Sequence, residues 1–302
     1  MWLLNDLADN IGRRMEVYYF MDERIIFEME GPIFTDNMPL HVVISGLSEF
    51  QNLVDRTYLV LSNRQRISTS ERETYRLLAH EFRKGSFWSE IEIFCVVTTQ
   101  MYLPFVAQLT PKVIWDYTKE TFSFLKLILS RRKKGQTPTI HAIDNGTVNI
   151  CYGGSQTFNF NAPVIQIGKD AITNYRGFTQ LIEKEGVNKI AAGRSTGPEI
   201  VLVKGDEELF RESPELASNT VKVRCEIFDF NKHKNTGKLA VAKGQDVPES
   251  EYPFSVLGSQ DYVQFVESML KAIVTVECIV ETGKDMLGES IIAKLQVLRV
   301  IQ

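Results

Sequence analysis

Hydrophobic residues in the first third of the chain change from a two-residue period to a helical one. Residues 15–30 alternate on both sides of a polar segment at 21–24, which predicts a β-hairpin turned at that segment. Residues 39–61 carry apolar side chains at steps of three and four, so we expect a long amphipathic helix. Residues 75–94 predict a second hairpin, although its first arm also fits a helix.

A second apolar segment, residues 115–129, has helical spacing and ends in an abrupt change of composition. It runs into a basic segment at 131–134, followed by Gly135 and Pro138, which is typical of the end of a helix. Beyond it, short alternating runs are separated by Asn-Gly and Gly-Gly pairs. We therefore predict two domains joined by a hinge at 131–139. Their expected bounds are 1–134 and 140–302.

The chain after this hinge is rich in predicted strands. Residues 140–160 fit short hairpins, and residues 168–185 fit a helix that Gly186 would cap. Residues 221–301 alternate in short runs, interrupted by a helical segment at 261–270. We expect an α+β fold, with an N-terminal domain built of a hairpin and a long helix. The strand-rich C-terminal domain should form a small barrel or a sandwich.

Composition and charge limit the class of protein. Of the 302 residues, 44% are hydrophobic and 24% charged, which is typical of folded globular proteins. The first residues lack a basic segment followed by a sustained apolar core, and uncharged apolar runs fall well short of about 20 residues, so we expect a cytoplasmic protein. The cysteines lie far apart, which favours buried free thiols over a disulfide frame or a zinc site. They are Cys95, Cys151, Cys225 and Cys278.

The apolar segment at 122–129 offers a first functional hypothesis. Its side chains point almost all round a helix, so one chain need not bury every side of it. The alternatives are a core helix, self-association, and shallow membrane contact beside the basic segment, of which we do not expect the last. An interface between copies would use Phe122, Phe124, Leu125, Ile128 and Leu129.

The basic segment that follows offers a second hypothesis. Arg131, Arg132, Lys133 and Lys134 would contact nucleic-acid phosphates without reading bases. The alternative is a favourable interaction with the dipole at the helix C-terminus. The net charge of −4 and the pI of about 5.7 argue against a dedicated DNA-binding protein.

No segment completes a catalytic, metal or cofactor motif, so we assign no catalytic residue and expect no cofactor. Ser123 and Lys126 have the Ser-x-x-Lys spacing, but the partner motifs are missing. Residues 193–197 only partly match a phosphate-binding loop, and the four histidines are isolated. The carboxylates considered for a metal-dependent hydrolase are Asp170, Glu183 and Glu185, although such a cluster also fits the solvated face of a helix.

Three short segments, together with the long helix and the strand-rich tail, carry a resemblance across most of the chain. They are Glu30-Gly31-Pro32, Arg83-Lys84-Gly85-Ser86-Phe87 and Gly146-Thr147-Val148-Asn149-Ile150. In the order of these segments, the chain resembles a group of bacterial accessory proteins without assigned activity, some of which are encoded near mobile elements and defence systems. The resemblance implies a setting and no chemistry.

These observations lead to one functional prediction and two alternatives. We predict a non-enzymatic interaction module, a homo-oligomeric accessory or sensor component of a bacterial, antiviral defence system. Its first domain would assemble copies and its second would bind a partner protein. The alternatives are a metal-dependent nuclease or other hydrolase, and a protein that binds nucleic-acid phosphates.

Overall fold

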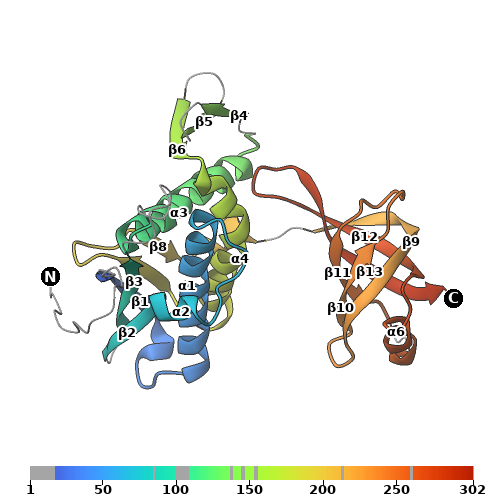
Figure 1. The fold of residues 1–302 in the computed structure, drawn as a ribbon, viewed down its shortest axis with the longest axis horizontal. Helices are drawn as coiled ribbons and strands as arrows, with labels where there is room; N and C mark the ends of the chain where they lie inside the picture. The colour runs from blue at the N-terminus through green and yellow to red at the C-terminus, as the bar shows by residue number, and fades with distance from the viewer. Residues whose placement is uncertain are drawn as a thin grey trace, which may run out of the picture. The chain divides into compact units, whose positions relative to one another are not determined.

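The computed structural model divides the chain into two compact units (Figure 1). The first comprises Met1–Leu127, Ile140–Ile150 and Phe158–Leu209, and the second comprises Ile128–Thr139, Cys151–Thr157 and Phe210–Gln302. The structure describes residues 18–83, 86–98, 109–136, 139–143, 147–152, 156–211, 214–258 and 261–301. The predicted turns at 84–85, 144–146 and 153–154 lie outside these residues.

The first unit contains a five-stranded antiparallel sheet with the order β2-β3-β1-β7-β8. The central strand β1 pairs with β3 on one side and with β7 on the other, where Ile26 lies opposite Gly193. The hairpin predicted for residues 75–94 is confirmed as β2 and β3. The strands are β1 (Tyr18–Glu30), β2 (Tyr75–Arg83), β3 (Phe87–Thr98), β7 (Lys189–Gly193) and β8 (Ile200–Val203).

The hairpin predicted for residues 15–30 is wrong, because β1 is one continuous strand. The polar residues at 21–24 continue the strand instead of turning it, since they find partners on neighbouring strands. Arg24 donates to Glu90 on β3 at 2.8 Å, and Glu23 accepts from Arg194 beyond β7. Cross-strand ion pairs of this kind stabilise a polar stretch within a sheet.

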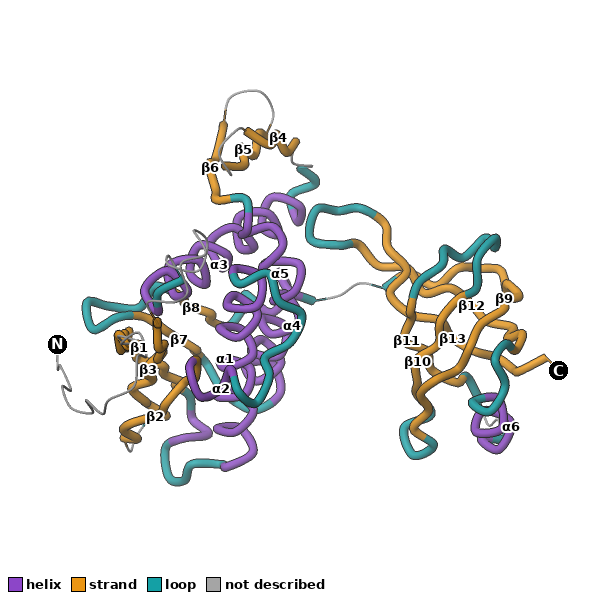
Figure 2. The backbone as a smooth tube through the Cα atoms, viewed as in Figure 1, coloured by secondary structure: helices purple, strands orange, loops and turns teal. Residues whose placement is uncertain are grey.

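Long helices pack against one face of this sheet and form the core with it (Figure 2). Phe27 of β1 contacts Phe50 of α1, with ring centroids 4.9 Å apart, and Phe178 of α4 at 6.1 Å. Trp115 of α3 is fully buried and lies 6.1 Å from Phe50. The predicted helix at 39–61 is confirmed. The helices of this unit are η1 (Pro32–Phe34), α1 (Leu40–Leu61), α2 (Glu71–Thr74), α3 (Pro111–Lys133, whose last residues group with the second unit), α4 (Pro163–Lys184) and α5 (Glu207–Phe210, whose last residue does the same).

The predicted domain bounds, 1–134 and 140–302, differ from the observed units. Strands β7 and β8 lie beyond the predicted hinge yet complete the sheet of the first unit. The buried face of α4, including Ile167, Tyr175 and Phe178, requires an apolar partner, which α1 and the sheet supply. A three-stranded sheet follows the end of α3, so the chain continues and returns instead of leaving the unit. Its strands are β4 (Thr139–Ile143), β5 (Thr147–Tyr152) and β6 (Gln156–Asn161).

The second unit contains a closed five-stranded barrel with the order β10-β11-β13-β12-β9. All neighbouring strands are antiparallel except β11 and β13, which are parallel, and α6 connects β11 to β12. This connectivity is that of an OB barrel. The predicted small barrel, and with it the α+β fold class, is confirmed. The elements are β9 (Glu215–Asn231), β10 (Thr236–Val241), β11 (Glu251–Val256), α6 (Tyr262–Ser268), β12 (Val274–Lys284) and β13 (Ser290–Ile301).

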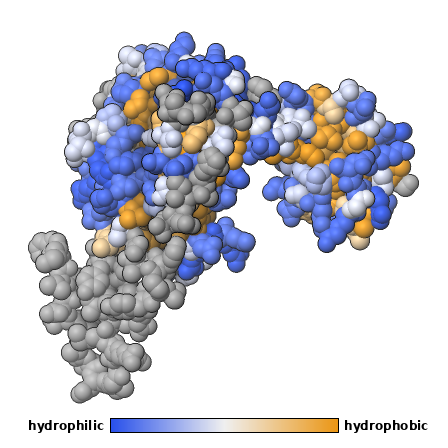
Figure 3. Space-filling model, turned by 90° about the horizontal axis from the view of Figure 1, so that it is seen from above, coloured by the Kyte–Doolittle hydropathy of each residue, from blue (hydrophilic) through white to orange (hydrophobic). Residues whose placement is uncertain are grey.

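The barrel encloses its own apolar core. Alternate residues of β9 point inward, and Phe265 of α6 closes the core by stacking on Phe230 and Phe254, with ring centroids 5.1 and 6.0 Å away. In the view of Figure 3, polar residues cover most of the surface of each unit and apolar residues form smaller areas. No helix among the described residues is long and apolar enough to cross a membrane.

Candidate functional site

The residues predicted as an interface between copies belong to the core instead. Phe122, Phe124, Leu125, Ile128 and Leu129 are each at most 6% exposed within a single chain. The ring of Phe124 lies 5.3 Å from Phe160, and that of Phe122 lies 5.6 Å from Tyr175. An apolar residue enclosed in this way offers no surface to a second copy. The core alternative therefore replaces the predicted interface.

The basic segment lies at the C-terminal end of α3, as predicted, and two of its arginines have local partners. Arg131 donates to Gln136 at 3.2 Å, and Arg132 donates to the backbone carbonyl of Asp285 at 2.6 Å. Lys133 and Lys134 are exposed. Arg131 and Arg132 therefore have local partners, and contact of the four residues with nucleic-acid phosphates stays a prediction.

The three carboxylates considered for hydrolysis do not converge. Asp170 accepts two hydrogen bonds of 3.1 Å from Gln166, and Glu185 lies 3.3 Å from His41. Glu183 is separated from Asp170 by a helical rise of roughly 20 Å. Within the described part of the chain, no group of three His, Cys, Asp or Glu side chains could hold a metal ion.

The remaining sequence motifs also serve local structure. The hydroxyl of Ser123 donates to the carbonyl of Lys119 at 3.2 Å, whereas Lys126 pairs with Asp206 at 3.0 Å. Nucleophilic catalysis would require a hydrogen bond between the Ser123 hydroxyl and the Lys126 amine, and both groups are instead bonded to other partners. Gly193 is the last residue of β7, and residues 194–197 lie in the turn that joins β7 to β8.

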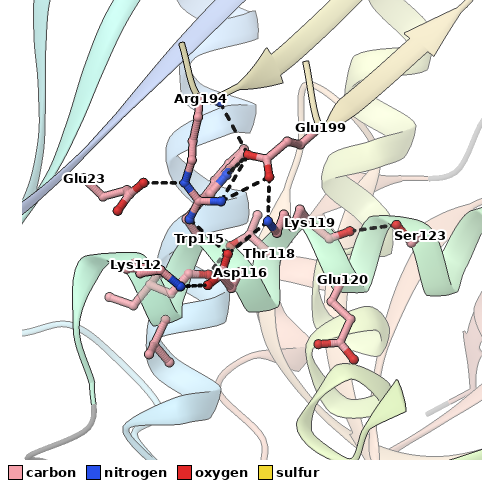
Figure 4. Close-up of polar contacts among 12 residues, drawn as sticks. Glu23, Lys112, Trp115, Asp116, Thr118, Lys119, Glu120, Ser123, Arg194 and Glu199 are labelled. Carbon is pink, nitrogen blue, oxygen red and sulfur yellow. Dashed lines mark hydrogen bonds and ion pairs between the residues drawn. The ribbon is translucent and has the colours of Figure 1, made fainter. Parts of the chain in front are cut away.

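Arg194, in that turn, is the centre of a charged network that the sequence did not indicate (Figure 4). It donates to Glu23 on β1 at 2.5 Å and to Asp116 on α3 at 2.9 Å. It also donates to Glu199 at 3.1 Å. Lys119 bridges the last two carboxylates, at 3.0 Å from Asp116 and 2.5 Å from Glu199. The network thus ties α3 to β1 and to the β7–β8 turn.

The pKa shifts of Asp116 and Arg194 indicate that the cations and carboxylates of this network stabilise one another in their charged forms. Burial alone would raise the pKa of Asp116. Hydrogen bonds from Lys112, Lys119 and Arg194 outweigh that effect and lower the pKa to about 2. Desolvation alone would lower the pKa of Arg194, whereas its hydrogen bonds to carboxylates, first of all Glu23, raise it above its ordinary value. Because cations and carboxylates satisfy one another here, we interpret the network as a structural clasp.

A different arrangement occurs on the outer face of the barrel. Strands β9, β10, β11 and β13 surround an open hollow of about 480 Å³. The basic side chains around it come from separate positions: Lys234 from the β9–β10 turn, Lys238 from β10 and Lys294 from β13. None of these three lysines forms an ion pair with a described residue. The other lining residues are Asp229, Asn231, Thr236, Gly237, Pro253 and Phe254.

Local structure fixes the backbone of two of the segments that line this hollow, the β9–β10 turn and β10 at Gly237. The side chain of Asn231 accepts from the backbone N–H groups of His233 and Lys234, at 3.0 and 3.2 Å, which fixes the turn. Gly237 allows the strands to pack closely, because an added Cβ would lie 2.6 Å from the ring of Phe254. Asp229 lies opposite Lys238 across the β9–β10 pair and supplies the one acidic group of the lining.

Phe228, the residue before Asp229 on β9, is an exposed aromatic residue. The register of β9 and β10 shifts between Lys238 and Leu239, so that Phe228 is the extra residue of a β-bulge. Its side chain is 40% exposed although most large apolar residues of β9 point inward. A bulge changes the direction of a side chain in this way, and here it exposes the ring of the residue that precedes Asp229, one of the residues that line the hollow.

Sequence reasoning missed this face because its residues are distant in the chain. Lys234 and Lys238 flank a predicted turn, but nothing marks Lys294 as their neighbour until β13 closes the barrel. Comparisons of the chain with protein-family models, with curated proteins and with solved structures find no match. A functional proposal therefore rests on the fold and on the hollow lined by Lys234, Lys238 and Lys294.

Proposed function

We propose that the chain is a binding protein whose barrel contacts single-stranded nucleic acid through its phosphates. The observation that carries this proposal is the set of three lysines without ion pairs, Lys234, Lys238 and Lys294, around one hollow. Unpaired ammonium groups close together repel one another, and an anion that enters the hollow relieves that repulsion. Among the predictions from the sequence, this proposal corresponds to the alternative of a protein that binds nucleic-acid phosphates, with lysines of the barrel in place of Arg131, Arg132, Lys133 and Lys134.

The position of the hollow supports a nucleic-acid chain as the ligand. In OB barrels the face of the second and third strands, with the adjoining loops, binds oligonucleotides and oligosaccharides. Here those strands are β10 and β11, and they contribute Lys238 and Pro253 to the lining. This step is an analogy between folds, and the lysines add a chemical reason to prefer a polyanion over a neutral sugar.

The exposed ring of Phe228 favours a single strand over a duplex. An unpaired base can stack on an exposed aromatic side chain, whereas bases within a duplex are already stacked on one another. The net charge of −4 provides no long-range attraction for nucleic acid, so affinity depends on the local cluster. We expect weak binding that salt disrupts readily. A role in bacterial defence stays a prediction.

Fluorescence anisotropy of a labelled single-stranded oligonucleotide, titrated with the intact protein, tests the proposal. Changing Lys234, Lys238 and Lys294 to Glu should lower the affinity by about tenfold or more at low salt. A matched variant changes three exposed lysines of the first unit to Glu and has the same net charge. The control positions are Lys169, Lys184 and Lys204.

The salt dependence adds a quantitative criterion. Three phosphate contacts with a single strand predict a slope of about −2 in a plot of log affinity against log salt concentration. Phe228→Ala should weaken binding without changing that slope, because stacking releases no counterions. Equal losses in the two triple variants would contradict the proposal, since total charge would then explain the binding. Absence of binding at low salt would also contradict it.

A further inference from the structure

Asp229 is the one acidic residue that lines the hollow formed by Lys234, Lys238 and Lys294. It lies opposite Lys238 across the β9–β10 pair, and the Cβ atoms of facing residues are about 5 Å apart in such a pair. Among the residues that the structure describes, none forms an ion pair or a hydrogen bond with the carboxylate of Asp229. This carboxylate therefore neutralises no lysine of the hollow, although one is within its reach.

An acidic group in this position opposes the binding of a simple polyanion. A phosphate near Asp229 is repelled by the carboxylate, because the two charges have the same sign. Carboxylate oxygens accept hydrogen bonds and donate none, so they offer nothing to a phosphate oxygen in return. A ligand that presented only phosphates would bind the hollow more tightly without Asp229. A ligand that satisfies all four charged side chains must carry a hydrogen-bond donor beside its phosphates.

Ribose supplies such a donor in every nucleotide of RNA. Its 2′-hydroxyl donates and accepts hydrogen bonds, and it is the group by which a protein distinguishes RNA from DNA. Deoxyribose has no hydroxyl at that position, so a DNA strand would bring phosphates towards Asp229 without a donor from its sugars. A phosphate and a 2′-hydroxyl belong to the same repeating unit of RNA, and Lys238 and Asp229 face each other across one strand pair.

The size and exposure of the hollow allow a sugar and its phosphate to enter. Its volume of about 480 Å³ lies within the range of roughly 300–1,000 Å³ that is typical of small-ligand sites. Asp229 and the three lysines are accessible, because the hollow is open on the outer face of the barrel. A nucleotide unit can therefore contact the carboxylate and an ammonium group together.

We infer that the hollow selects single-stranded RNA over single-stranded DNA, with Asp229 accepting a hydrogen bond from a ribose 2′-hydroxyl while the lysines contact phosphates. This inference rests on the proposed binding of nucleic acid and assigns its substrate class. It gives Asp229 an effect opposite in sign to that of the lysines on DNA. The carboxylate lowers the affinity for a DNA strand, whereas the lysines raise it.

Fluorescence anisotropy with three labelled oligonucleotides of equal length tests the inference on the intact protein at low salt. They are oligouridine RNA, its 2′-O-methyl form and the deoxyuridine strand, of which the last two lack the 2′-hydroxyl donor. Uracil has no exocyclic amino group, so these strands exclude a contact of Asp229 with the amino group of cytosine. The RNA should bind about fivefold more tightly than either other strand, as expected for one charge-assisted hydrogen bond open to solvent.

Variants at Asp229 separate its charge from its capacity to accept a hydrogen bond. Asp229→Ala should raise the affinity for the deoxyuridine strand by about threefold or more, since the repulsion is removed, and should equalise the three affinities. Asp229→Asn keeps an acceptor oxygen without the charge and should retain part of the preference for RNA. Glu226→Ala is the control, because Glu226 is exposed on the same strand outside the hollow. It changes the net charge equally and should leave the preference intact.

Two results would overturn the inference while leaving the proposed function in place. They are equal affinity of the parent protein for the three strands, and a preference for RNA that survives in Asp229→Ala. In both cases, loss of binding to all three strands when Lys234, Lys238 and Lys294 are changed to Glu would still support phosphate contact by the hollow. Absence of binding to any strand would instead overturn both proposals.

Discussion

The indole Nε1 of Trp115 donates a hydrogen bond of 2.6 Å to Oε2 of Glu199. The ring of Trp115 is fully buried against Phe50, so one side chain joins the apolar core to the charged clasp around Arg194. Through this contact α3 is connected both to the helices beside it and to the start of β8. The clasp is therefore placed by the core, and its charges need no external partner.

Removing the guanidinium at the centre of the clasp should destabilise the protein. Arg194→Ala leaves the carboxylates of Glu23, Asp116 and Glu199 with fewer partners, and we expect the free energy of unfolding to fall by about 2 kcal/mol. Arg24→Ala is the control, because the pair of Arg24 with Glu90 is largely exposed and should contribute less than about 1 kcal/mol. Urea denaturation measures both. Equal effects would contradict the role assigned to the clasp.

The lowered pKa of Asp116 predicts a sensitivity to acid. A carboxylate whose pKa is about 2 in the folded state, below its unfolded value of about 4, stabilises the folded state above that unfolded value. This contribution is lost as the pH falls from about 4 towards 2. Asp116→Asn should therefore be less stable than the parent at pH 7, and the difference should narrow over that pH range. A difference that stays constant would contradict the assignment.

The cysteines should differ in their reactivity. Burial raises the pKa of Cys95 to about 12 and those of Cys225 and Cys278 to about 12 and 11, so little thiolate forms at neutral pH. All four thiols are free, and Cys151 is the one that is not buried. In the native protein, a disulfide reagent should modify Cys151 first and reach the others only after denaturation. Rapid modification of two or more thiols would contradict the burial of Cys95 in the first unit or of Cys225 and Cys278 in the barrel core.

Two glycines of the barrel should respond differently to the same substitution. A Cβ at Gly237 would collide with the backbone of Asp229 and the ring of Phe254, whereas one at Gly283 would make an ordinary contact of 3.5 Å with Ala293. Gly237→Ala should therefore lower the midpoint of thermal unfolding by several degrees, and Gly283→Ala should leave it nearly unchanged. Comparable midpoints for the two variants would show that the close approach of β9, β10 and β11 is incorrect.

The sequence predicted well the elements whose pattern is local. Hydrophobic residues recur with a helical period at 39–61 and with a two-residue period in the barrel strands, and the structure has a helix and strands there, as predicted. The polar residues 21–24 suggest a turn from the sequence alone, because their stabilising partners, Glu90 on β3 and Arg194 in the β7–β8 turn, are distant in the chain. The sequence of an apolar helix such as 122–129 is the same whether its own chain or a second copy covers it, so sequence alone does not distinguish a core helix from an interface.

Neither the domain bounds nor the lysine-lined hollow could be predicted from the sequence, because both depend on pairing between strands that are distant in the chain. The sequence contains a true helix end at 131–134, but nothing there shows that the chain returns to pair β7 with β1. Lys294 likewise gives no sign of its neighbours, because only the parallel pairing of β11 with β13 brings it to Pro253 and Lys238. When a site is formed by residues from separate strands, their spacing along the sequence does not indicate that they are neighbours.

Hydrogen–deuterium exchange with and without a single-stranded oligonucleotide tests the central claim most directly, because it locates the contact. We predict slower exchange of the backbone amides at 231–241, 251–256 and 290–297, which surround the lysine hollow, with no comparable change in the β7–β8 turn. The same protection should disappear when Lys234, Lys238 and Lys294 are changed to Glu. Protection confined to the first unit, or no protection at a saturating oligonucleotide concentration, would contradict the account.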